Sequence, residues 1–144
     1  MNALAARYLY GLETPLEQEL VEAYMTALVR VAQANGIVET ESRVLQGVAD
    51  SLGAGPFVLT RLMGRRDDGD FEASLLRLRR RPAMVSMLYR DAMLVAYADG
   101  EIDDEEKKVL AGVAEKLGLT EAAISAADAA VDELEGLRKR MASL

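Results

Sequence analysis

The sequence predicts an all-α fold of about seven helices, and three observations support this prediction. Helix-favouring residues dominate the 144-residue chain, whereas aromatic residues make up 5% of it and prolines number 3. Apolar residues recur at three- and four-residue steps, which places them on one face of a helix. Helix-capping and helix-ending residues stand between these stripes. With 51% apolar side chains, residues 1–144 are expected to form a single domain.

The first three helices are predicted over residues 16–35, 39–52 and 56–63. Thr14 is a capping residue followed by Pro15 at the first helical position, and Gly36 is a natural stop. Gly53 ends the second helix, and Gly55-Pro56 begins the third.

The last four helices are predicted over residues 71–79, 82–98, 104–117 and 121–140. Asp70 is expected to cap the first of these, and Arg81-Pro82 begins the next. Asp103 with Glu106 three residues later forms a capping pattern, and Thr120 caps the final helix.

The chain contains neither cysteine nor histidine, which excludes most site chemistry. Disulfides, Cys/His zinc sites and a histidine base are all ruled out, and no nucleophile elbow or phosphate-binding glycine loop is present. We therefore expect no enzymatic activity. The first residues do not form a secretory signal and no apolar run could span a membrane, so we expect a cytoplasmic protein that is not transmembrane.

The net charge of −7 is distributed unevenly along the chain. Residues 61–90 carry 8 basic and 4 acidic groups, whereas residues 91–144 carry 6 basic and 13 acidic groups. Binding to nucleic acid needs an uncompensated positive face, so nucleic acid is not expected as a partner. An acidic surface suits cations or basic partners.

The chain contains an internal repeat of one helix-loop-helix hairpin. RVLQGVADSLG at 43–53 aligns with KVLAGVAEKLG at 108–118, at a constant offset of 65 residues. Upstream, VAQANGIVETE at 31–41 aligns with VAYADGEIDDEE at 95–106 after a one-residue gap. Because only two copies occur, the repeat predicts a pseudo-twofold bundle and not a solenoid.

The second copy of the repeat resembles a known family. AYADGEIDDEE at 96–106, followed by Leu110 and by LGL at 117–119, is similar to the signature hairpin of the tellurite-resistance TerB-like family. The resemblance extends from about residue 20 to residue 134. It implies an all-helical fold of about seven helices with two related hairpins, and a link to tellurite or metal stress without an established enzymatic activity.

The resemblance also implies an acidic cluster that binds divalent cations where the hairpin loops meet. The matching positions are Asp99, Asp103, Asp104 and Glu106 in the second hairpin, with Glu39 and Glu41 in the first. The first hairpin departs from the pattern, because Asn35 and Val38 replace two of the acids. A calcium-binding EF-hand is excluded, since Val95 and Tyr97 would occupy its first two ligand positions.

Three further groups of side chains are interpreted as structural. Met84, Met87 and Met93 are expected in the core. Tyr8, Tyr10, Tyr24 and Tyr97 are expected to be half-buried, with their hydroxyls at the rim. The arginines of residues 61–81 are expected to form a solvated face that pairs with acidic parts of the same protein or of a neighbouring copy.

Two hypotheses for function remain open on the sequence alone. In the first, the loop from Asp99 to Glu106 binds a divalent cation or a basic partner. In the second, the chain is a helical interaction or assembly scaffold, its loop is purely structural, and its partner is another protein or a second copy of itself. They differ in the effect of Asp99→Asn with Asp103→Asn, which abolishes cation binding in the first and costs only capping stability in the second.

Overall fold

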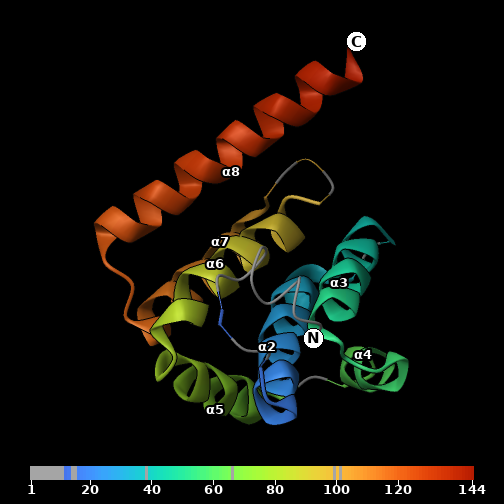
Figure 1. Cartoon of the computed structure of the whole chain (residues 1–144), viewed down its shortest axis with the longest axis vertical. Coiled ribbons are helices and arrows are strands. Elements are labelled where there is room, and N and C mark those ends of the chain that lie inside the picture. The colour runs from blue at the N-terminus through green and yellow to red at the C-terminus, as the bar shows by residue number, and fades with distance from the viewer. Residues whose placement is uncertain (1–11, 14–15, 38, 66, 99, 101) are drawn as a thin grey trace.

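The computed structural model describes residues 12–13, 16–37, 39–65, 67–98, 100 and 102–144. Within these residues it contains seven α-helices and no strand, as the sequence predicts (Figure 1). The helices are α2 (Gln18–Ala32), α3 (Glu39–Leu52), α4 (Pro56–Met63), α5 (Asp68–Arg79), α6 (Pro82–Ala96), α7 (Asp104–Leu117) and α8 (Glu121–Ala142), with a short 3₁₀ helix η1 (Gln33–Asn35) after α2. None of the described helices is both long and apolar enough to cross a membrane.

Helix α2 lies at the centre of the bundle. It contacts α3, α4, α5, α6 and α7, and most of its side chains are buried. A helix that is apolar nearly all round is stable only when neighbours cover every face. Figure 1 shows the other helices arranged around α2, with α8 on the outside.

The two copies of the repeat fold as matching helix pairs. Helices α2 and α6 each have 15 residues, and α3 and α7 each have 14. Among the described residues, the glycines with positive φ also fall at equivalent positions, Gly36 with Gly100 and Gly53 with Gly118. The latter two both have a φ of 72°, where a side chain would be strained. The repeat in the sequence is therefore a repeat in the backbone.

Two predicted helix starts are wrong. The helix predicted from residue 16 begins at Gln18 with Glu17 as its N-cap, while Thr14 and Pro15 lie outside the described residues. The helix that Asp70 was expected to cap begins earlier, because the Asp67 side chain accepts a hydrogen bond of 3.0 Å from the Asp70 backbone N–H. The cap is thus the first aspartate of this acidic run.

The position of Tyr24 also differs from the prediction. Its side chain is fully buried, and its hydroxyl donates a 2.6 Å hydrogen bond to the carboxylate of Asp91 on α6. Arg90 pairs with the other oxygen of the same carboxylate at 2.8 Å. A buried carboxylate needs such partners, so this cluster ties the first helix of one repeat to that of the other. Tyr97 is half-buried as expected, and Tyr8 and Tyr10 lie outside the described residues.

The methionines and arginines lie largely where they were predicted. Met84 and Met93 are core residues, and Met87 is half-buried against the core. Arg61 pairs with Glu22, Arg65 with Asp70, and Arg81 with Glu17. These are ion pairs within the chain on a solvated surface.

Candidate binding groove

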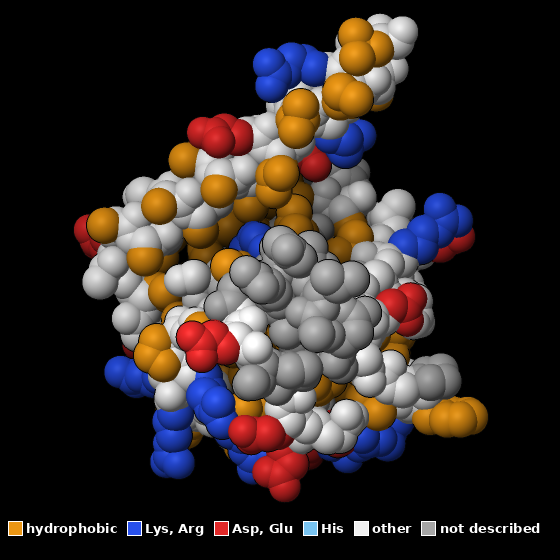
Figure 2. Space-filling view, viewed as in Figure 1, with side chains coloured by type: hydrophobic (Ala, Val, Ile, Leu, Met, Phe, Trp, Pro, Cys, Tyr) orange, Lys and Arg blue, Asp and Glu red, His pale blue; other side chains and the backbone are white. Residues whose placement is uncertain are grey.

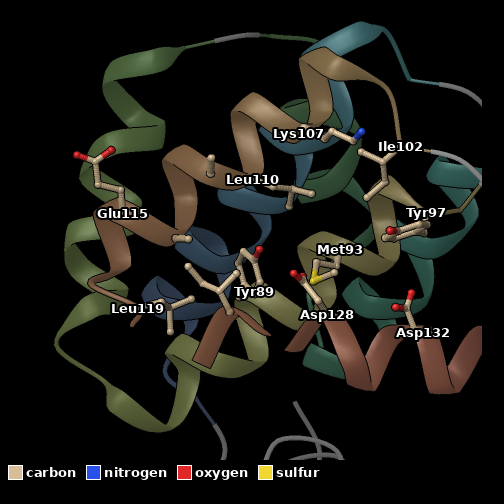
Figure 3. Close-up of a pocket in the computed structure, with 13 residues that line it drawn as sticks. Tyr89, Met93, Tyr97, Ile102, Lys107, Leu110, Glu115, Leu119, Asp128 and Asp132 are labelled. Carbon is tan, nitrogen blue, oxygen red and sulfur yellow. The ribbon is translucent and has the colours of Figure 1, made fainter. Parts of the chain in front are cut away.

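A groove lies between α6, α7 and α8. Its volume is about 630 Å³, within the range of sites that take small molecules or a few side chains. Most of its floor is apolar, and besides Tyr89 and Tyr97 its apolar residues are Met93, Ile102, Leu110, Ala111, Ala114, Leu119 and Ile124. In Figure 3, the labelled Met93 and Leu110 project into the space between the three helices.

The groove forms because α8 touches the rest of the bundle along only part of its length. Val131 is the buried residue of α8, and the helix packs mainly on α6. Gly118 ends α7 in the left-handed conformation, and Thr120 caps α8 by accepting a hydrogen bond from the Ala123 backbone N–H. This short turn sets the direction of α8 across α6.

Two aspartates of α8 form the acidic wall of the groove. Asp128 and Asp132 are four residues apart, so they share one face of the helix. Figure 3 shows both pointing from α8 toward α6, with Asp128 next to Met93. Glu115 and Lys107 of α7 complete the charged lining, which leaves the groove net negative.

The electrostatics of the groove shift two ionisation equilibria. Partial burial, and then the neighbouring Asp132 carboxylate, raise the pKa of Asp128 above its ordinary value. Burial, and then the charges of Asp128 and Tyr97, raise the pKa of the Tyr89 phenol. A positive charge bound in the groove would lower both of these raised pKa values.

The six acidic residues predicted to bind a cation do not share one environment in the fold. Asp103 and Asp104 lie at the start of α7, where Asp103 accepts a 2.8 Å hydrogen bond from the Glu106 backbone N–H. Glu39 is exposed at the start of α3 and pairs with Arg43 at 2.7 Å. Asp99 lies outside the described residues.

The remaining two, Glu41 and Glu106, are buried. They occupy equivalent positions in the first turns of α3 and α7, where the helix dipole favours a negative charge. Among the residues that the structure describes, no three acidic side chains are grouped so that they could hold a metal ion. The six-residue metal site stays a prediction, since it includes Asp99.

Comparison with known proteins identifies the family. The family model of tellurite resistance protein TerB matches residues 58–129, which is half of the chain. The chain belongs to the TerB family. A crystal structure of a tellurite resistance protein from Nostoc punctiforme superposes with a TM-score of 0.75 and is 21% identical over 98% of this chain and 93% of that one. That likeness shows a common all-helical fold. No curated protein matches the chain.

The TerB match covers the groove better than it covers the repeat. It includes the second hairpin and every groove-lining residue except Asp132, whereas α2 and α3 precede it. The part of the chain that is recognisably TerB is thus the part that builds the groove. Sequence reasoning missed this feature, although acids at 128 and 132 among the alanines of α8 are a signal for it.

Proposed function

We propose that this TerB-family chain is a cytoplasmic, non-enzymatic binding module of the tellurite or metal stress response. Its groove between α6, α7 and α8 binds a basic, partly apolar segment of a protein partner. The observation that supports the proposal is the combination of an apolar floor with the acidic pair Asp128 and Asp132 along one wall. Such a surface favours a ligand that is apolar on one side and positively charged on the other.

The charge pattern of the groove supports a basic ligand over an acidic or neutral one. Asp128 is partly buried and lies near the like charge of Asp132, and both effects raise its pKa. A lysine or arginine seated beside both aspartates relieves that repulsion, whereas an anion adds to it. The apolar floor accommodates the aliphatic part of such a side chain.

Cation binding at the second hairpin loop is the second candidate. It is favoured by the exposed Asp104 beside Asp103 at the first turn of α7, where carboxylate oxygens suit hard divalent cations. This candidate is weaker than the groove, because Glu41 and Glu106 are buried and Glu39 already pairs with Arg43. The two candidates use different carboxylates, so one set of variants separates them.

A set of synthetic peptides tests the groove. Three fluorescent helical peptides of equal length are titrated with the protein, one of leucine and lysine, one of leucine and glutamate, and one of serine and lysine. We expect the leucine-lysine peptide to bind most tightly by fluorescence anisotropy, because it satisfies both the floor and the wall. Equal binding of the two lysine peptides would indicate unspecific attraction to an acidic protein and would refute the proposal.

Substitutions place the peptide on the groove. Asp128→Asn with Asp132→Asn removes two contacts of about 0.5–1 kcal/mol each, so affinity falls roughly tenfold. Asp50→Asn with Glu121→Gln is the matched control, since it removes two exposed carboxylates outside the groove lining and should change affinity less than twofold. Ala111→Phe, at an exposed position in the lining, should block binding sterically.

A cation titration tests the second candidate separately. Thermal unfolding with millimolar calcium, magnesium, manganese or zinc is compared between the natural protein and Asp99→Asn with Asp103→Asn. A site filled at one hundred times its dissociation constant stabilises by about 2.7 kcal/mol. A shift of that size for one cation, lost in the variant, would support the loop as a cation site. Equal small shifts in both proteins would eliminate it.

A further inference from the structure

Helix α8 has an apolar stripe that is exposed in the part of the chain that the structure describes. Leu134, Leu137, Met141 and Leu144 are 46%, 48%, 62% and 97% exposed. The spacing of Leu134, Leu137 and Met141 by three and four residues places them on one face of α8, and Leu144 follows just past its end. Figure 1 shows the C-terminal end of α8 extending past the other helices, and Figure 2 shows hydrophobic side chains following it.

The same face changes from small to large side chains along its length. At its N-terminal end, the positions in line with the stripe are Ala123, Ala126 and Ala130. Ala126 and Ala130 are exposed, like the large residues that follow them. In an antiparallel pair of such helices, Met141 of one copy can lie over Ala130 of the other, which lets the two backbones approach closely there.

The charged residues of α8 also change along the helix, from acidic near its start to basic near its end. Its acidic residues come first and its basic residues last, in the order Glu121, Asp128, Asp132, Glu133, Glu135, Arg138, Lys139, Arg140. Glu133 and Arg140 are seven residues apart, so they lie on one flank of the stripe. An antiparallel pair brings Glu133 of each copy beside Arg140 of the other. A parallel pair brings like charges together.

We propose that the partner of this face is a second copy of the chain, bound antiparallel through α8. The pairing sets Leu134 of one copy beside Leu137 of the other and Met141 over Ala130. Residues 129–142 then overlap along about 21 Å of helix. The symmetric, self-complementary contact is the kind that forms twofold dimers. Asp128 and Asp132 lie on the groove-facing side of α8, so the dimer leaves the groove open and does not depend on its function.

Removal of one stripe residue tests the apolar contact. Leu137→Asn is compared with Leu76→Asn on α5, because Leu76 is similarly exposed, at 55%, and lies outside α8. By sedimentation equilibrium we expect the dimer dissociation constant to rise at least tenfold in the first variant and less than twofold in the second. A natural protein that stays monomeric at all concentrations, or equal effects of the two variants, would overturn the proposal. Circular dichroism confirms that each variant retains its helices.

A charge exchange tests the flank of the stripe. Glu133→Arg alone places two repulsive pairs in each dimer and should weaken association, as should Arg140→Glu alone. The double variant restores both pairs with reversed charge and should recover most of the affinity. Additive weakening in the double variant would overturn the assigned register.

A distance measurement tests the direction of the helices. The chain has no cysteine, so Ser143→Cys accepts a single spin label at an exposed position. In the antiparallel dimer the two labelled Cα atoms lie about 24 Å apart, from about 1.5 Å of rise per residue and about 9 Å between axes. A parallel pair gives about 10 Å and would contradict the proposal.

Discussion

The hydrogen bond between Tyr24 and Asp91 is expected to contribute measurably to stability, and Tyr24→Phe isolates it. The substitution keeps the buried ring and removes only the hydroxyl, which lies 2.6 Å from an oxygen of the buried Asp91 carboxylate. A hydrogen bond to a charged group contributes about 1.5–3 kcal/mol net. For 144 residues the entropy of unfolding is about 0.3 kcal/mol per kelvin. The melting temperature should therefore fall by about 5–10 °C.

Tyr97→Phe is the matched control, because the Tyr97 side chain is half-buried at the edge of the groove and not enclosed in the core. Removing that hydroxyl should lower the melting temperature by less than about 2 °C. Differential scanning calorimetry measures both variants. If Tyr24→Phe loses no more stability than Tyr97→Phe, the buried cluster does not stabilise the contact between the two repeats, and the reasoning fails.

Substitutions at four other positions give predictions of defined sign. Asp103→Ala removes the N-cap of α7 and should cost about 1 kcal/mol, or about 3 °C, whereas Asp103→Asn should retain most of the cap. Gly53→Ala and Gly118→Ala place a side chain at a φ of 72°, so calorimetry should show each to lose about 1–2 kcal/mol. The folded pKa of Asp128 is raised, so as pH increases from 3.8 through that folded pKa the natural protein should lose stability relative to Asp128→Asn. The same variant should lower the pKa of Tyr89 toward 10.0, which phenolate absorbance measures.

Helices and their repetition are readable from the sequence because they depend on local patterns. Apolar spacing and the glycines at 53 and 118 predict α3 and α7 to within a residue. The start of α5 was misplaced because three aspartates, at 67, 68 and 70, offer equivalent caps. Local pattern does not decide among neighbouring residues of the same capping type.

The groove and the Tyr24–Asp91 pair depend on contacts that are distant in sequence. Asp91 lies 67 residues from the tyrosine that bonds to it, and no local pattern links the two. The groove is likewise set by how far α8 stands from α6 and α7. The acidic loop was predicted to bind a cation because its carboxylates are close together in the sequence. In the fold, however, Glu106 is buried, as is its counterpart Glu41. Density of charge in a sequence does not indicate exposure.

The most direct test of the proposed function is an NMR titration of the isoleucine methyl groups with the leucine-lysine peptide. The chain has three isoleucines, of which Ile102 and Ile124 line the groove and Ile37 lies outside its lining. We predict saturable shifts at Ile102 and Ile124 and none at Ile37, with the groove shifts lost in Asp128→Asn with Asp132→Asn. Saturable binding that leaves Ile102 and Ile124 unchanged would contradict the assignment of the groove as the binding site.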